Sequence, residues 1–508
     1  MRRSASLLLK IVLVLALFGI VEPARTGRSA EEDASIDVVT TAPLKEPGLI
    51  VSLTVSLEDC IKLAAYNSFE VKLAKLDMKI AEQDKGIKEA VFDTALFSNL
   101  NYADEQRRQL SVFGGNFLRN VYEGGVMKTL PTGTEVTAAV NDTRSWTNSG
   151  FNVDNPAHEI ELALDLKQPV AKNIFGVNDR WTITATKLAI VNADLDMKER
   201  IEILFADVEK AYWQFVFTKE NLRIFREIRQ RAKNLHETNI KSFDVGRIER
   251  ADFLASEANV LTREKDVRIA ENSYRRSEEM LKLLLNVDGS GRIYPAEDLK
   301  LKEFKCSVED SLTTAFEKRR DYYKAKREIK IKDITLKVRS NERWPEVDLV
   351  GTYAINGIRR KVQKAAASVS GNDAYFFGGI EITLPVENNA ARSEFKKADF
   401  DKEKAIIELK NVERKIVTDV GNAVRDYKTY ETNVETLLEV VTLQREKLAE
   451  EDKRFGFGRS TTKTLIDYQS DYLKSQLEAS MGLRDLEQSK VDLNRATNAL
   501  LGDYEVYL

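Results

Sequence analysis

Cysteine and histidine are almost absent from this sequence, which has two of each in 508 residues. Cys60 and Cys306 are far apart, and neither belongs to a Cys-x-x-Cys pair or to a zinc-type His–Cys spacing. His158 and His236 are isolated, so we interpret both as ordinary surface residues. The sequence therefore indicates no metal site. It leaves open whether the two cysteines form a disulfide in an oxidising compartment.

Proline is also rare, with nine residues, whereas charged residues make up 31% of the chain. This combination favours long, solvated helices over a compact α/β enzyme. The net charge of -3 gives no reason to expect a nucleic-acid partner. The sequence has no glycine-rich phosphate loop and no catalytic constellation that can be assembled. We therefore expect neither enzyme activity nor a catalytic cofactor.

Long hydrophobic runs are missing except near the N-terminus. Arg2 and Arg3 precede an uncharged apolar run, Ile11–Val21, of about eleven residues, which is too short for a membrane helix but typical of a secretory signal. We expect a signal peptide over 1–30 and a flexible lead-in over 31–52, with a buried hydrophobic N-terminus as the alternative. Later in the chain no run reaches about 18 apolar residues, so only strands could enter a membrane.

The sequence contains an internal repeat, because four short motifs occur in the same order in both halves. The pairs are Ser56–Asp59 with Ser307–Asp310, Leu166–Val170 with Leu384–Val386, Phe243–Arg247 with Phe455–Arg459, and Leu284–Asn286 with Leu500–Gly502. We expect a first repeat over 53–287, a linker over 288–306, a second repeat over 307–502 and a C-terminal tail over 503–508.

Each repeat is expected to contain a helix, a strand region, a long helix, a glycine turn and a returning helix. The expected ranges are 56–89, 95–170, 179–241 and 249–285 in the first repeat, and 307–341, 347–386, 390–453 and 461–501 in the second. A helix over 179–241 would be roughly 90 Å long and must pack against partners along its length, as in a coiled coil. Gly246 and Gly458 are expected at the reversing turns because glycine tolerates a positive φ.

The expected strands alternate apolar with polar residues, most clearly in Ile160–Leu166 and Ile380–Leu384. A period of two places the apolar residues on one face, which could face lipid or the core of a soluble sandwich. Aromatic residues gather near the strand ends, as in a membrane-interface girdle. They are Phe92, Phe97, Tyr102, Trp146, Trp344, Tyr353, Tyr375, Phe376 and Phe377. Two strands per repeat give about four per chain, too few to close a barrel, so a membrane barrel requires several chains.

The first strand region is about thirty-five residues longer than the second, and the extra part is rich in turn residues. It contains glycine pairs at 114–115 and 124–125, then Leu130–Gly133 and Asn148–Gly150. This composition predicts an enlarged external loop or an added hairpin. Together with 365–373 in the second repeat, we expect these segments to narrow or decorate an outer mouth.

The order and duplication of these segments resemble the TolC family of outer-membrane efflux proteins from about Leu53 to Leu501. Leu166–Pro169 and Phe455–Gly458 are similar to two recurrent sites of that family. The resemblance implies a mainly α homotrimer with a membrane β-barrel of twelve strands, four from each chain, continuous with a twelve-helix α-barrel. It implies a passive channel of a tripartite efflux or type I secretion system, in the outer membrane with its tunnel in the periplasm. Its implied partners are a periplasmic adaptor and an inner-membrane pump.

The resemblance also implies a gate at the hairpin tips, held shut by polar links between neighbouring hairpins. Asp252 falls at the family's gate aspartate and Phe455 at its tyrosine partner, so this link lacks the hydroxyl group. Ser460 falls at the gate arginine, although Arg459 is its neighbour. We therefore expect a tip that is latched less tightly or in a different way.

Acidic residues ring the entrance in the family. Of its two ring aspartates, Asp467 matches the inner one, whereas Thr464 replaces the outer one. Three Asp467 carboxylates facing a narrow pore would attract cations, although a solvated surface role is the alternative. The tip residues expected to contact the adaptor are Gly246, Arg247, Gly458 and Arg459.

Two other functions stay open at the level of the sequence. One is a coiled-coil scaffold, in solution or on a membrane surface, whose strands form a small cap. The other is a hydrolase, supported only by scattered acidic residues. The sequence does not indicate the cargo.

Overall fold

The computed structural model describes residues 53–106, 117–148, 154–287, 291–302 and 304–504. The expected signal peptide and lead-in therefore lie outside the described residues. The chain divides into two units, and every helix and strand described below belongs to the unit formed by 52–289 and 293–508.

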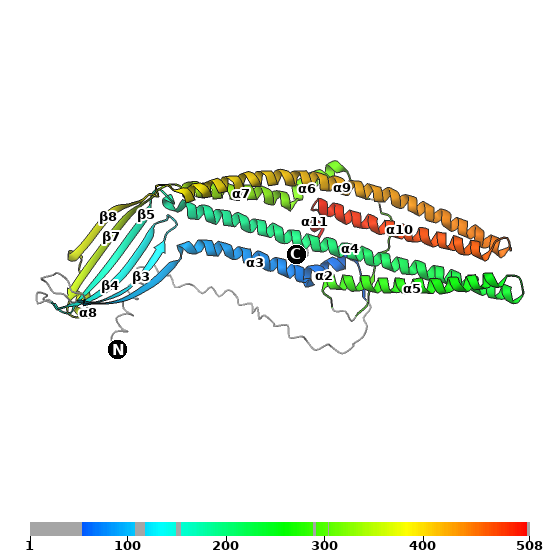
Figure 1. The fold of residues 1–508 in the computed structure, drawn as a ribbon, viewed down its shortest axis with the longest axis horizontal. Coiled ribbons are helices and arrows are strands. Elements are labelled where there is room, and N and C mark those ends of the chain that lie inside the picture. The colour runs from blue at the N-terminus through cyan, green and yellow to red at the C-terminus, as the bar shows by residue number, and fades with distance from the viewer. Residues whose placement is uncertain (1–52, 107–116, 149–153, 288–290, 303, 505–508) are drawn as a thin grey trace. The chain divides into compact units, whose positions relative to one another are not determined.

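Two helices of 68 residues each, α4 (Val177–Asp244) and α9 (Asn389–Gly456), dominate this unit. At 1.5 Å per residue each is roughly 100 Å long. A tight turn follows each, and α5 (Arg250–Leu285) and α10 (Thr462–Ala496) then run back along them (Figure 1). The predicted helical hairpins are confirmed.

The hairpin turns depend on glycine, as predicted. Gly246 and Gly458 have φ values of 70° and 69°. The N–H groups that follow them close the helix ends, from Arg247 to the Ser242 carbonyl at 2.8 Å and from Arg459 to the Arg454 carbonyl at 2.9 Å. Such bonds satisfy carbonyls that the end of a helix would otherwise leave without a partner.

Shorter helices pack beside the halves of α4 and α9 that the returning helices do not cover. They are α2 (Leu57–Asn67), α3 (Phe69–Glu89), α6 (Val308–Lys318) and α7 (Arg320–Asn341). The expectation of one helix over 56–89 and one over 307–341 was wrong, because both ranges are broken. Ser68 has ψ 135° and its hydroxyl accepts the N–H of Glu70 at 3.2 Å, which caps a new helix. Arg319 has ψ 121° and a buried guanidinium that binds Asp321 and Asp419.

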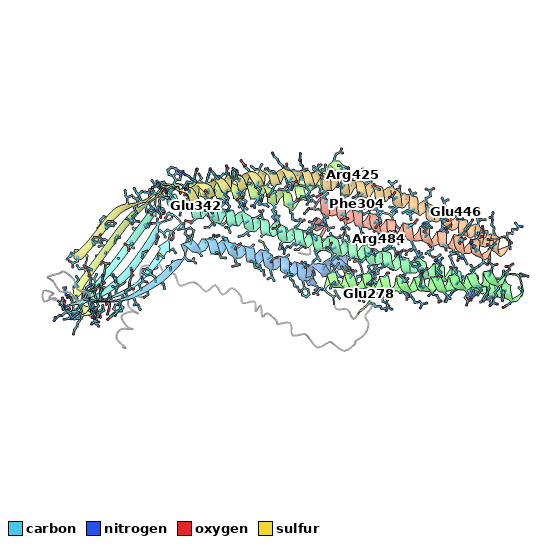
Figure 2. All side chains as sticks on the ribbon, in the orientation of Figure 1. Glu278, Phe304, Glu342, Arg425, Glu446 and Arg484 are labelled. Carbon is cyan, nitrogen blue, oxygen red and sulfur yellow. The ribbon has the colours of Figure 1, made fainter. Side chains whose placement is uncertain are left out.

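The largest apolar core lies midway along the helices, where α2, α4, α5 and α11 (Leu500–Tyr504) meet. A short parallel pair, β1 (Leu53–Val55) and β6 (Ile293–Pro295), adjoins this core. Figure 2 labels Glu278 on α5, whose carboxylate accepts the N–H of Ile293 at 3.1 Å and pairs with Lys282 at 2.7 Å. Cys60 is buried in this core and Cys306 lies in other apolar clusters, so both are free thiols.

One antiparallel sheet holds six strands, in the order β2-β3-β4-β5-β7-β8. They are β2 (Thr94–Glu105), β3 (Phe117–Thr129), β4 (Glu135–Thr147), β5 (Ala157–Pro169), β7 (Glu346–Arg359) and β8 (Ala374–Thr383). The expected count of four per chain was wrong, because the turn-rich segment forms an added hairpin, β3–β4. Gly124 and Gly125 lie inside β3, and the Phe97 ring occupies the space above Gly125, 2.7 Å from where a Cβ would stand. Gly125 therefore admits an aromatic ring, and neither glycine marks a turn.

The Leu130–Gly133 turn lies at the helix end of the sheet, so its expected place at an outer mouth was wrong. A Cβ on Gly133 would stand 2.6 Å from the Gly176 nitrogen, and both glycines have positive φ. Gly176 ends the 3-10 turn η2 (Ile174–Gly176) just before α4. The glycine pair at 114–115 and residues 149–150 lie outside the described residues.

Short helical turns connect the remaining elements. The turn η1 (Ala90–Phe92) joins α3 to β2. After β7, the range expected to be turn-rich holds α8 (Val362–Ser368) and η3 (Gly371–Asp373). Figure 1 places α8 at the end of the strands that is far from the long helices.

Candidate functional site

One face of the six-stranded sheet is apolar. The strand register brings branched and aromatic side chains into common rows, for example Leu96, Val126, Ala138, Leu164, Tyr353 and Phe376. Leu96 and Phe376, on the two edge strands, are 81% and 80% exposed. A large exposed apolar surface of this kind marks contact with lipid or another protein. The predicted alternation is confirmed on β5, where Leu162, Leu164 and Leu166 share this face.

The opposite face is polar and acidic. Cross-strand bonds order it: Asn99 donates to Glu123 at 2.9 Å, and Asn356 to Glu159 at 2.8 Å. Lys167 pairs with Asp348 at 2.9 Å. On the described strands this face has nine carboxylates and two cations. The carboxylates are Glu105, Glu123, Glu135, Glu159, Glu161, Asp165, Glu346, Asp348 and Glu381, and the cations are Arg119 and Lys167. A polar face of this kind can stay in contact with water.

The predicted aromatic girdle is divided between the faces. Tyr102, Trp146, Tyr353 and Phe376 lie on the apolar face. Phe97, Tyr375 and Phe377 lie on the polar face, so the expectation that they join the girdle was wrong. For two of them the reason is packing against glycine: Phe97 covers Gly125, and the Phe377 ring lies 2.9 Å from where a Cβ on Gly379 would stand.

Among the described strands of the single chain, β2 and β8 each have a strand neighbour on one side only. β2 runs away from the helices and β8 runs back toward them, because α3 precedes β2 and α9 follows β8. An open edge with unpaired backbone groups invites pairing with another strand.

None of the described helices has an apolar stretch long enough to span a bilayer. Among the described residues, no group of acidic, histidine or cysteine side chains is arranged to hold a metal ion.

The two long hairpins share an apolar seam near their tips. The buried residues of this seam are Ile224, Ile228, Leu235, Leu448, Leu465, Tyr472 and Leu473. They come from α4, α9 and α10, so the seam holds one hairpin against the other within a single chain.

Polar links also join the hairpins, one beside this seam and one on its tip side. Asn239 on α4 donates to the Thr462 hydroxyl on α10 at 3.1 Å, and both residues are 1% exposed. Arg263 on α5 donates to the Ser470 hydroxyl on α10 at 2.7 Å. The Asn239–Thr462 bond is fully buried, whereas the Arg263–Ser470 bond is only partly buried. Because a hydrogen bond is stronger when it is shielded from water, the Asn239–Thr462 bond is the stronger of the two links.

No protein-family model and no curated protein matches this sequence. Solved structures do match. The CmeC outer membrane channel of Campylobacter jejuni is 15% identical, has a TM-score of 0.65, and the match covers 89% of each chain. The MtrE outer membrane channel of Neisseria gonorrhoeae, in its open state, is 16% identical with a TM-score of 0.64, covering 87% of this chain and 89% of that one. The chain has the TolC-like outer-membrane channel fold. The outer membrane protein VceC of Vibrio cholerae, 12% identical with a TM-score of 0.64, also matches, over 87% and 95% of the chains.

Within this channel fold, the residues expected at the gate lie close to the tips and make the following contacts inside the single chain. The Phe455 ring packs against the apolar seam. Asp252 is half-buried, and its backbone carbonyl accepts the Asn239 amide at 3.5 Å. Ser460 donates to the buried carboxylate of Glu451, within its own hairpin.

The other predicted site residues lie at the start of α10 and on the two turns. The Thr464 N–H donates to the Thr461 hydroxyl at 3.2 Å, so Thr464 belongs to the helix cap. Asp467 is exposed. The expected adaptor contacts Gly246, Arg247, Gly458 and Arg459 are all exposed. The turns also expose Val245 and Phe457, by 66% and 79%.

Sequence reasoning missed Asn239, Thr462 and Arg263, three of the residues whose side chains link the hairpins. A signal for Asn239 was available: it follows Leu235 by four residues in the buried stripe of α4. A lone amide at a position with apolar spacing indicates a specific buried partner. Its partner, 223 residues further on, could not be identified from spacing.

A charged cluster lies where α4, α7, α9 and α10 approach, around a cavity of about 480 Å³. Arg320 pairs there with the carboxylate of Glu202, which is 2% exposed. Burial raises the pKa of the Glu202 carboxyl, and the Arg320 guanidinium opposes that rise. This pair therefore fixes the start of α7 to α4.

Proposed function

We propose that this chain is one protomer of a homotrimeric outer-membrane channel, a passive conduit for small molecules or proteins in a tripartite efflux or type I secretion system. The observation that carries the proposal is a sheet with one apolar and one water-suited face and two open edges, at the end of paired helical hairpins. The channel fold of the matched structures supports the same conclusion. A conduit of this kind needs no catalytic chemistry of its own.

The open edges of the sheet support closure by copies of the same chain. Since β2 and β8 run in opposite directions, β8 of one copy can pair antiparallel with β2 of the next. Three copies with six strands each would form an eighteen-stranded barrel in place of the expected twelve-stranded one. Barrels of about 16–18 strands enclose an aqueous channel. The apolar face would then meet lipid, and the acidic face would line the lumen.

The helical hairpins would form the tunnel in the periplasm, with their tips toward a periplasmic adaptor and an inner-membrane pump that supplies the energy. Exposed Val245 and Phe457 beside the turn glycines support a docking role for the tips. The seam between the hairpins supports a gate that opens when they separate. Asp467, exposed near the start of α10, is proposed to face the entrance.

The test is single-channel recording with two matched arginine substitutions on β4. Ala138 lies on the apolar face opposite Leu164, and Thr137 lies on the polar face opposite Asp165. Ala138→Arg should reduce the yield of inserted trimer, because arginine on a lipid face costs about 2–4 kcal/mol near the midplane. Thr137→Arg should insert normally.

The wild-type protein should form stable pores in planar bilayers and remain in outer-membrane fractions as a trimer. A monomer that forms no pores would refute the proposal. Equal insertion of the two variants would show that the apolar face does not meet lipid. Sheet closure between copies is tested separately by cysteines placed on β2 and β8, which should cross-link neighbouring protomers.

A further inference from the structure

Two arginine side chains interrupt the apolar face of the sheet at the strand ends far from the helices. Arg144, His158 and Arg359 lie in one row on β4, β5 and β7, in direct register. The row on the helix side of it contains Asp142, Ile160 and Gly357. Beyond that row the face is mostly apolar, so Arg144 and Arg359 lie at its boundary, at the strand ends far from the helices.

The helix α8 lies on this same face. A Cβ on Gly357 would stand 2.6 Å from both the Ala365 carbonyl and the Ser368 hydroxyl, so only glycine admits α8 here. Ala365 is fully buried by this contact. The packing brings Lys361 and Lys364, both exposed, to the side of the sheet that carries Arg144 and Arg359. Figure 1 shows α8 at the strand ends.

Cations outnumber carboxylates in this cluster, which consists of the cations Arg144, Arg359, Arg360, Lys361 and Lys364, the carboxylates Asp142 and Asp154, and His158. His158 pairs with Asp142 at 3.1 Å, and Arg360 lies 3.8 Å from Asp154. Within the described part of the chain, no carboxylate is within ion-pairing distance of Arg144, Arg359, Lys361 or Lys364. Among the described residues, four cations therefore gather at the edge of a lipid-facing surface with no carboxylate close enough to form an ion pair with them.

A cation at the boundary of the hydrocarbon layer needs an anion there, because burying an unpaired charge is costly. We propose that this cluster binds the phosphate groups of a phosphorylated glycolipid headgroup in the outer leaflet. The guanidinium groups of Arg144 and Arg359 are suited to bidentate contact with phosphate. Lys361, which caps α8, and Lys364 on α8 add two positive charges to the same site. The site rests on the proposed function, since that function orients the far strand ends toward the outer leaflet.

The experiment measures binding of bisphosphorylated lipid A to the purified full-length trimer in neutral detergent. Dephosphorylated lipid A and inorganic phosphate serve as competing probes. The test variant is Arg144→Gln/Arg359→Gln. The control is Lys128→Gln, which removes a cation from the same face at its helix end. We expect the test variant to bind lipid A at least about tenfold more weakly, since it loses two charge-assisted contacts, and the control to bind like wild type.

Equal binding of the dephosphorylated lipid, or wild-type affinity in the double variant, would overturn the proposal. Displacement of lipid A by millimolar inorganic phosphate would show a free-anion site and would overturn the assignment to a headgroup. If the double variant fails to form trimers, Lys361→Gln/Lys364→Gln on the exposed face of α8 replaces it, with the same expected loss. Pore formation in phosphatidylcholine bilayers, without lipid A, tests the channel function separately.

Discussion

We predict that removing the buried Asn239–Thr462 hydrogen bond shifts the hairpins from the closed toward the open state. Thr462→Val keeps the shape of the side chain but removes the hydroxyl that accepts the Asn239 amide at 3.1 Å. The other acceptor of that amide, the Asp252 carbonyl, is 3.5 Å away, and the Asn239 carbonyl oxygen already has no partner among the described residues. The substitution therefore leaves a 1%-exposed amide poorly satisfied while the hairpins are closed.

The expected magnitude follows from the cost of an unsatisfied buried donor, which is about 1–3 kcal/mol. When the hairpins separate, water reaches Asn239, so the cost applies only to the closed state. The closed–open equilibrium should shift toward the open state by about 5- to 150-fold. We expect a higher open probability in single-channel recordings at a fixed voltage, and greater sensitivity of cells to large antibiotics.

Two control variants make this prediction specific. Asn239→Leu/Thr462→Val replaces both partners with apolar groups, so most of the closed state should be recovered. Thr436→Val is the same substitution on α9 at an exposed threonine that bonds only to its own helix, at the Thr432 carbonyl, and it should behave like wild type. An unchanged open probability in Thr462→Val, or a double variant as leaky as the single one, would refute the reasoning.

Three other substitutions or labels test the rest of the structure. Burial raises the pKa of the Cys60 thiol to about 12, so iodoacetamide at pH 8 should label it only after unfolding, as mass spectrometry can check; rapid native labelling would contradict its burial. Arg320→Met should lower the free energy of unfolding by about 3–5 kcal/mol at pH 7.5, because it leaves the Glu202 carboxylate buried without its partner. The pKa of Glu202 is raised in the folded chain, so the carboxyl group becomes protonated and neutral as the pH falls toward 4.5, and the loss of stability should shrink. Denaturant unfolding that shows a pH-independent loss would exclude Glu202 as the cause. Gly133→Ala should lower the heat resistance of the trimer, because its Cβ would stand 2.6 Å from the Gly176 nitrogen at a φ that costs about 1–3 kcal/mol for alanine; an unchanged melting temperature would contradict this contact.

The helical hairpins were predictable because their signals are local. The stretch 179–241 has no glycine or proline, and Gly246 supplies the positive φ of a reversing turn. Helix breaks were less visible, because Ser68 and Arg319 are compatible with a helix, and their extended backbone depends on a cap and on distant carboxylates. The predicted gate residues lie near the tips, but Phe455 packs into an apolar seam that the sequence did not reveal.

The sequence by itself determined the hairpins and the two-faced strands, because helix length and a period of two are encoded in neighbouring residues. Only the tertiary structure decided that six strands form the sheet, since the Phe97 ring from the adjacent strand assigns Gly125 to a strand and not to a turn. It also decided which side chains link the hairpins: Asn239 and Thr462 are 223 residues apart. Contacts across such separations depend on how whole helices pack, and no local pattern records that packing.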